Sequence, residues 1–219
     1  MSAVTVPGTV VRSQGTHRYH QPMFISFEGL DGCGKTTQAA MLADALEGEG
    51  REVVRVREPG GTGAGERIRA LLLDPDARIG PSAEALLYAA ARAQLVDDVI
   101  RPAIERGADV VADRFIDSSL AYQGAARGLG IDRILEVNAL ATGGMMPDRT
   151  LLLRLPGGEA ASRRSDSPDR IEAEGASFHD AVAEGFEEAA RRFPERITVV
   201  DASGPREDVL KRVRTAAGL

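Results

Sequence analysis

Gly29-Leu30-Asp31-Gly32-Cys33-Gly34-Lys35-Thr36 is the stretch of sequence that decides the fold. It matches the phosphate-binding loop pattern G-x-x-x-x-G-K-[ST] at every fixed position. Residues 23–27 before it form an apolar run typical of a buried strand, and residues 36–46 after it repeat apolar side chains at helical spacing. A chance glycine turn would not explain why strand, loop and helix occur in this order. The stretch therefore predicts a nucleotide phosphate site, because backbone N–H groups and a helix N-terminus attract phosphate oxygens.

Individual residues of this loop have predicted roles. Lys35 would reach the β- and γ-phosphates, and the Thr36 hydroxyl would be a ligand of Mg²⁺. Cys33 is either a small tolerated side chain or a thiol whose pKa the surrounding amides lower. The predicted ATP-binding residues are Gly29, Gly32, Cys33, Gly34, Lys35, Thr36 and Thr37.

Composition narrows the class of protein. The 219 residues fit one α/β domain, and we expect residues 1–22 to be a flexible extension of a single domain over 23–219. A net charge of −6 argues against a nucleic-acid-binding surface, and no apolar run approaches the ~18 residues of a membrane span. Because Cys33 is the only cysteine, we expect no internal disulfide and a reducing, cytoplasmic location.

Further strands and helices alternate along the chain. Apolar runs predict strands over 52–57, 109–112, 149–155 and 196–200. Helical spacing predicts helices over 65–73, 81–106, 131–141, 174–192 and 205–216, with a kink at Pro102 in the long second helix and an apolar stripe that includes Leu86. This alternation predicts an α/β fold with a sheet flanked by helices.

Polar and charged residues follow the predicted strands. Residues 58–62 (Glu-Pro-Gly-Gly-Thr) come after the second strand, and Asp113 and Arg114 come after the third. In parallel sheets this edge binds ligands, so Asp113 is a candidate Mg²⁺ ligand together with Thr36. ATPase motors usually have a second acid where this chain has Arg114, a cation suited to phosphate.

Two further segments have more than one interpretation. Residues 156–170 are polar and contain Arg163, Arg164 and Arg170, so they are either a lid that carries cations or a solvated loop. Tyr88 and Arg92 are four residues apart and share a helix face. Together they could stack on and hydrogen-bond a planar ring, or they could be an exposed pair of neighbours.

Over residues 23–215 the chain resembles the thymidylate kinase family. The resemblance depends on five ordered motifs, at 27–38 (FEGLDGCGKTTQ), 57–62 (REPGGT), 88–94 (YAAARAQ), 113–124 (DRFIDSSLAYQG) and 169–172 (DRIE). It implies a P-loop three-layer sandwich with a five-stranded parallel sheet and a short lid, usually as a homodimer. The implied reaction uses ATP and Mg²⁺ to convert dTMP to dTDP, a step toward dTTP.

The resemblance also implies the roles of individual residues. Asp31 would contact the sugar-phosphate end of dTMP, and Arg57 and Arg114 would hold its phosphate. Tyr88 would stack on thymine, Arg92 would hydrogen-bond its carbonyl edge, and Tyr122 would crowd the 2′ position. Ser118, Ser119 and Gln123 complete the implied dTMP site. Some members carry an arginine in the loop where this chain has Gly32 and Cys33, so the chain resembles the branch whose catalytic arginines come from the lid. The implied catalytic residues are Lys35, Asp31, Arg114, Arg163, Arg164 and Arg170.

The sequence departs from the family pattern at two positions. Arg154 replaces an aspartate that commonly ends the fourth strand, and Ala91 replaces an acid that often precedes the ring-binding arginine. Another nucleoside or nucleoside monophosphate kinase, and an inactive nucleotide-binding partner protein, stay as alternatives. A GTP-binding switch is disfavoured because the chain has no N-K-x-D segment.

Overall fold

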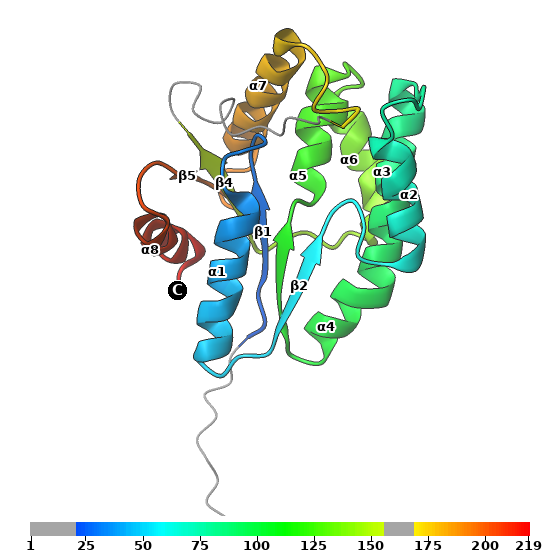
Figure 1. Ribbon diagram of the computed structural model, residues 1–219. Helices are drawn as coiled ribbons and strands as arrows, with labels where there is room; N and C mark the ends of the chain where they lie inside the picture. Colours follow the sequence, from blue (N-terminus) through cyan, green and yellow to red (C-terminus); the bar gives the residue numbers. More distant parts are fainter. Residues whose placement is uncertain (1–20, 156–168) are drawn as a thin grey trace, which may run out of the picture.

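A computed structural model of the chain describes residues 21–155 and 169–219 (Figure 1). The predicted N-terminal extension and the predicted lid, with Arg163 and Arg164, therefore lie almost entirely outside the described residues. Only residues 21–22 of the extension and residues 169–170 of the lid are described.

Strands and helices alternate as the sequence predicts. The strands are β1 Phe24–Glu28, β2 Val53–Arg57, β3 Asp109–Asp113, β4 Arg149–Arg154 and β5 Ile197–Asp201. The α-helices are α1 Lys35–Gly48, α2 Gly63–Leu73, α3 Pro81–Leu95, α4 Arg101–Glu105, α5 Ile116–Ser119, α6 Ile131–Thr142, α7 Ala176–Arg192 and α8 Arg206–Ala217. Two π-helical segments are η1 Val96–Ile100 and η2 Leu120–Ala126.

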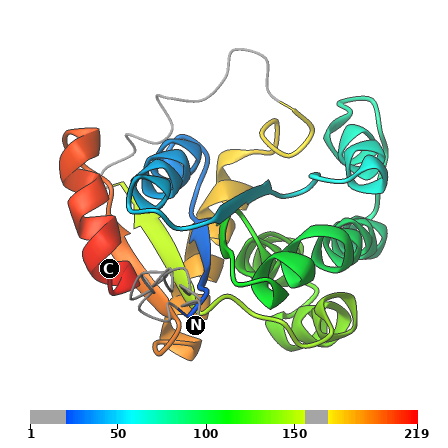
Figure 2. The same cartoon turned by 90° about the horizontal axis from the view of Figure 1, so that it is seen from below.

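In the described part of the chain, the five strands form one parallel sheet in the order β2-β3-β1-β4-β5. Helices α1 and α8 cover one face, and α3, η2 and α7 are among the elements that cover the other, as Figure 2 shows from below. The prediction of a three-layer α/β fold is confirmed. Because all strands run the same way, the loops after β1, β2 and β3 meet at one edge of the sheet.

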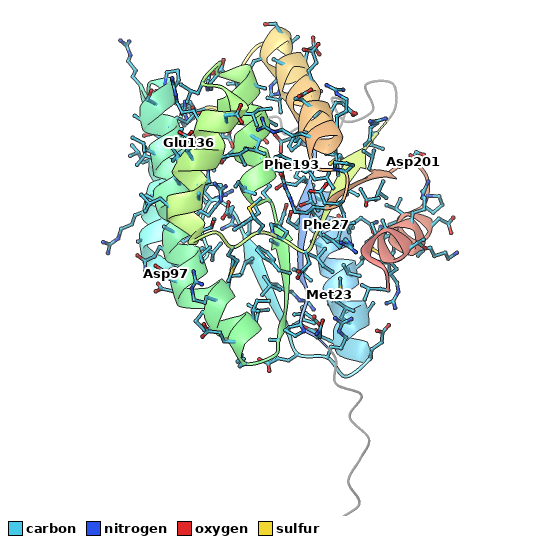
Figure 3. The ribbon with its side chains drawn as sticks, turned by 180° about the vertical axis from the view of Figure 1, so that it is seen from behind. Met23, Phe27, Asp97, Glu136, Phe193 and Asp201 are labelled. Atoms are coloured by element: carbon cyan, nitrogen blue, oxygen red, sulfur yellow. The ribbon has the colours of Figure 1, made fainter. Side chains whose placement is uncertain are left out.

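The central strand β1 sends alternate side chains to the two faces. Ile25 and Phe27 pack with α1 and α8, and Phe24 packs on the opposite face with α3 and α4. Figure 3 shows Phe27 inside the molecule, whereas Asp97 and Glu136 lie on its outer helices. By the same alternation, Glu28 is directed to the face where α5 begins, and it is fully buried there.

The long helix predicted over 81–106 consists of three consecutive helical segments. The π-helical η1 lies just before Pro102, where the proline lacks an N–H and its ring crowds the carbonyl of residue 98. The wider π-helical turn of η1 relieves this crowding. The predicted effect of Pro102 on the helix therefore takes the form of this π-helical turn. The assignment of Leu86 to the apolar core stripe is wrong, because its side chain is 59% exposed.

No helix among the residues described is long and apolar enough to cross a membrane.

Candidate active site

A cleft of about 790 Å³ opens at the carboxyl ends of β1, β2 and β3. It brings together most of the residues that the sequence predicts for the ATP and dTMP sites. The predicted residues that line it are Asp31, Gly32, Gly34, Lys35, Thr36, Thr37, Arg57, Tyr88, Asp113, Arg114, Ser118, Ser119, Tyr122 and Gln123.

The phosphate-binding loop needs glycine at its first position. Gly29 has φ +133°, and a Cβ on it would lie 2.5 Å from the Leu153 carbonyl oxygen. The loop ends on Gly34, where α1 begins without an acidic residue in its first turn. The helix itself therefore places no carboxylate at its positive end, which suits a phosphate. The thiol of Cys33 is buried, and burial raises its pKa, so a reactive thiolate is not favoured.

Asp31 lies between two cations of the cleft. Its Oδ1 is 2.5 Å from Arg114 Nη2 and 3.6 Å from Lys35 Nζ. Burial alone would raise the pKa of Asp31, but the charges of Arg114 and Lys35 lower it to about 2. The carboxylate thus stays ionised and holds both cations close together in the cleft, where two phosphate groups could meet.

Arg114 has an unusual backbone conformation for a residue with a side chain, with φ +73°. Its N–H donates to the Phe27 carbonyl at 3.0 Å, and the next N–H, of Phe115, donates to Glu28 Oε1 at 2.7 Å. The Ser118 hydroxyl donates to Glu28 Oε2 at 2.6 Å and accepts from Arg114 Nη1 at 2.9 Å. Glu28 therefore fixes both the strained turn and, through Ser118, the guanidinium group.

Thr36 lies in the first turn of α1, directly after the phosphate-binding loop, and contacts Asp113 at the end of β3. The Thr36 hydroxyl donates to Asp113 Oδ2 at 2.5 Å. A hydroxyl and a carboxylate oxygen are ligands that Mg²⁺ accepts, so the pair fits the predicted metal site. Over residues 21–155 and 169–219, no group of three or more His, Cys, Asp or Glu side chains could hold a metal ion. An ion at this pair would need phosphate and water oxygens to complete its shell.

Aromatic side chains form part of the cleft wall. The Tyr122 hydroxyl donates to Asp31 Oδ2 at 3.3 Å, and its ring packs edge-on against Phe178 and Phe186. Tyr88 also lines the cleft, and burial raises the pKa values of both tyrosines, so their hydroxyls stay protonated. Tyr122 is thus held beside Asp31, and Tyr88 supplies a second aromatic side chain of the cleft wall.

Arg57 and Arg92 have very different surroundings. Arg57 Nη2 lies 3.1 Å from Glu66 Oε1, and its side chain is about half exposed. Arg92 is fully buried and is not among the described residues that line the cleft. Its guanidinium donates to Glu58 Oε2 at 2.5 Å and to the Ser119 hydroxyl at 3.0 Å. The alternative of an exposed Tyr88–Arg92 pair is therefore wrong for the arginine.

Arg170 likewise lies behind the cleft wall. Its Nη2 donates to Glu84 Oε2 at 2.8 Å and its Nε to the Leu72 carbonyl at 2.8 Å. Arg154, at the end of β4, turns its guanidinium to Glu187 of α7. Neither contact reaches the phosphate loop.

Sequence reasoning missed several residues of the site. Glu28, Glu58 and Glu84 are buried and hold the arginines or polar side chains described above. Arg69 and Asp169 also line the cleft. Glu28, Glu58 and Asp169 lie within the motifs at 27–38, 57–62 and 169–172, so the sequence already pointed to their segments. Glu84 also carried a signal, since it precedes Tyr88 by one helical turn and therefore shares its face.

Comparisons with known proteins point to one family. A family model described as thymidylate kinase matches residues 27–213. A thymidylate kinase of Gloeobacter violaceus is 50% identical over 198 residues, which cover 89% of this chain and 93% of that protein. A thymidylate kinase of Clavibacter michiganensis subsp. michiganensis is 50% identical over 200 residues, covering 89% and 94%.

A solved structure shares the fold as well as the sequence. The crystal structure of thymidylate kinase from Ehrlichia chaffeensis superposes with a TM-score of 0.76 at 31% identity, over 91% of this chain and all of that one. With the family model, the relatives and the phosphate-loop cleft all in agreement, this chain belongs to the thymidylate kinase family.

Proposed function

We propose that the protein transfers the γ-phosphoryl group of ATP to dTMP, giving ADP and dTDP. The observation that carries this proposal is the position of Asp31. It holds Lys35 of the phosphate loop and Arg114 within one cleft that also includes Tyr88 and Gln123. A phosphate donor on the loop and a nucleotide acceptor on the opposite wall would then place their phosphates between the two cations.

Catalysis in this site would depend on alignment and on charge. The phosphate of dTMP is already an anionic nucleophile near neutral pH, so no strong base is needed. Lys35 and Arg114 would offset the repulsion between the two phosphate groups and stabilise the charge that moves between oxygens. Asp31 would keep both cations in place while the phosphates approach.

We propose Thr36 and Asp113 as the protein ligands of Mg²⁺. The metal, when bound, neutralises charge on the donor phosphates. The protein contributes the hydroxyl and carboxylate oxygens at the loop and at the end of β3.

We assign thymine to the wall formed by Tyr88, Ser119 and Gln123, with Arg57 and Arg114 at the acceptor phosphate. Tyr122 would stand beside the sugar, since its hydroxyl is tied to Asp31 and Arg114. Ser118 would support Arg114. Arg92 lies behind this wall, where its guanidinium donates to Ser119. We keep the proposal that Arg92 hydrogen-bonds the carbonyl edge of the base.

Further expectations from the sequence stay as proposals. Arg163, Arg164 and Arg170 would supply lid cations, of which Arg170 is described and is bound to Glu84. We propose one domain over 23–219, a homodimer and a cytoplasmic location. We propose no nucleic-acid or membrane partner.

A coupled assay of ADP release tests the function. Wild-type protein with ATP and Mg²⁺ is given dTMP, dUMP, dCMP, dGMP, AMP or thymidine, and turnover dominated by dTMP is expected. Lys35→Ala serves as the control for phosphate-loop chemistry. It should lower kcat at least ~10²-fold, because one preorganised donor is lost.

The other outcomes separate the alternatives. Preference for thymidine or another monophosphate would keep the phosphate loop but overturn the acceptor assignments. ATP binding without turnover of any acceptor would indicate an inactive partner protein. A near-normal rate for Lys35→Ala would overturn the loop assignment.

A further inference from the structure

Glu84 is the centre of a buried polar cluster behind the cleft wall. Its side chain is 0% exposed and lies in the first turn of α3, one turn before Tyr88. It accepts hydrogen bonds from Gln123 of η2, from Arg127 and from Arg170. The proposed function uses none of these bonds, although Gln123 itself lines the cleft.

Both oxygens of Glu84 accept from Arg127, but their other partners differ. Oε2 accepts from Arg127 Nη2 at 3.1 Å and from Arg170 Nη2 at 2.8 Å. Oε1 takes Gln123 Nε2 at 2.9 Å and, at 3.2 Å, Arg127 Nε. A carboxylate that faces two guanidinium groups offers only acceptors to its neighbours.

This arrangement decides which way the Gln123 amide points. Its NH₂ group must face Glu84, because the carbonyl oxygen would meet another acceptor there. The carbonyl oxygen of Gln123 has no hydrogen-bond partner in the described part of the chain. Since Gln123 lines the cleft, the group left for a ligand is an acceptor.

We propose that Glu84 is a positioning residue that holds the Gln123 carbonyl toward the cleft and thereby selects thymine over cytosine. The proposal rests on the proposed function, in which Gln123 faces the base of dTMP. The thymine ring has one hydrogen-bond donor, N3–H, whereas N3 of cytosine is an acceptor. An acceptor on the wall opposite N3 therefore binds thymine and repels cytosine.

The substitution Glu84→Gln tests the proposal, because only Oε1 contacts Gln123 and only Oε2 contacts Arg170. The carbonyl of the new amide should stay with Arg170 Nη2 and Arg127 Nη2, which places its NH₂ group where Oε1 faced Gln123. The longer contact of Arg127 Nε, at 3.2 Å, is then lost. The Gln123 amide then turns over and presents its NH₂ group to the cleft. We expect kcat/KM for dTMP to fall about tenfold and kcat/KM for dCMP to rise, because one hydrogen bond is lost for one base and gained for the other.

Further variants distinguish a positioning role of Glu84 from a general loosening of the buried polar cluster. Gln123→Met removes the amide, so it should lower kcat/KM for dTMP without the selective rise for dCMP. In the double variant, Glu84→Gln should have no further effect on the dTMP/dCMP ratio. Glu174→Gln is the matched control. It breaks the Arg127–Glu174 ion pair of 2.6 Å in the same cluster but leaves Gln123 on Glu84, so the ratio should stay that of wild type.

Several results would overturn the proposal. These are an unchanged dTMP/dCMP ratio in folded Glu84→Gln, an equal loss for both nucleotides, and a further change in ratio when Glu84→Gln is added to Gln123→Met. If Glu84→Gln does not fold, Gln123→Met alone decides, and an unchanged ratio for it counts against the proposal. A wild type that does not phosphorylate dTMP would instead overturn the proposed function, so the two failures are distinguishable.

Discussion

At the scale of single residues, Glu28 links the pH dependence of stability to the active site. Burial, and next to it repulsion from Asp117, raises the pKa of Glu28 from 4.5 to about 8. Between these values the native state keeps a proton that the unfolded state releases. The stability from this group is therefore complete below about pH 4.5 and is lost as the pH rises through about 8.

The substitution Glu28→Gln should remove this loss of stability at high pH. Glutamine cannot ionise. Like the protonated carboxyl, and unlike the carboxylate to which Ser118 donates, its amide can accept from the Phe115 N–H and donate to the Ser118 oxygen. Wild type should lose about 2–3 kcal/mol of unfolding free energy relative to the variant between about pH 6 and 9, measured by urea denaturation. Glu105→Gln, at an exposed position of α4, should follow wild type. Parallel curves for wild type and Glu28→Gln would contradict the prediction.

Residues differed in how far they could be predicted from sequence. The phosphate loop was predictable because its spacing is fixed by the backbone that surrounds a phosphate. The environment of Arg92 was not, since Glu58, Ser119 and Asn138 are 34, 27 and 46 residues away. No local pattern reports such contacts.

At the scale of elements, α7 packs closely against η2, the segment that carries Tyr122 and Gln123. A Cβ on Gly185 of α7 would lie 2.7 Å from the Ala125 Cβ and 2.8 Å from the Ala121 Cα. Gly185→Ala should therefore destabilise the fold by about 1–3 kcal/mol, despite the better helix propensity of alanine. It should also raise KM for dTMP more than for ATP, because η2 must shift.

Gly48→Ala is the matched control, since nothing lies within 4 Å of a Cβ at this helical position. It should be neutral or stabilise by up to ~1 kcal/mol in thermal or urea unfolding. If Gly185→Ala were as stable as Gly48→Ala, η2 would be able to shift without loss of stability, and the prediction would be wrong.

The elements that sequence alone could not predict are those where polar function interrupts the apolar pattern. Residues 116–126 form α5 and η2, but Asp117, Ser118 and Gly124 conceal the helical spacing there. The apolar runs of β1, β3 and β4 carried a clear signal, because these strands are buried on both faces. The apolar pattern in the sequence is therefore clearest for the strands that are buried on both faces.

At the scale of the whole molecule, exposed leucines indicate where a second copy would bind. Three of the large hydrophobic side chains most exposed in the described residues are Leu71 at 47%, Leu86 at 59% and Leu140 at 89%. They lie on α2, α3 and α6, which pack side by side away from α8 (Figures 1 and 2). Isolated exposed leucines are common, but three on adjacent helices fit the surface of an isologous dimer.

We expect the wild-type protein to sediment as a dimer of its 23.2 kDa chain. Leu86→Asp combined with Leu140→Asp should convert it to a monomer, because each buried leucine contributes about 1.5–3 kcal/mol and each aspartate adds the cost of burying a charge. Lys211→Asp on α8, a side chain that is 78% exposed, is the control and should stay dimeric. A monomeric wild type would disprove the dimer. A dimer that survives both aspartates would mean that it uses another face, because a leucine contact of this kind cannot accommodate two unpaired carboxylates.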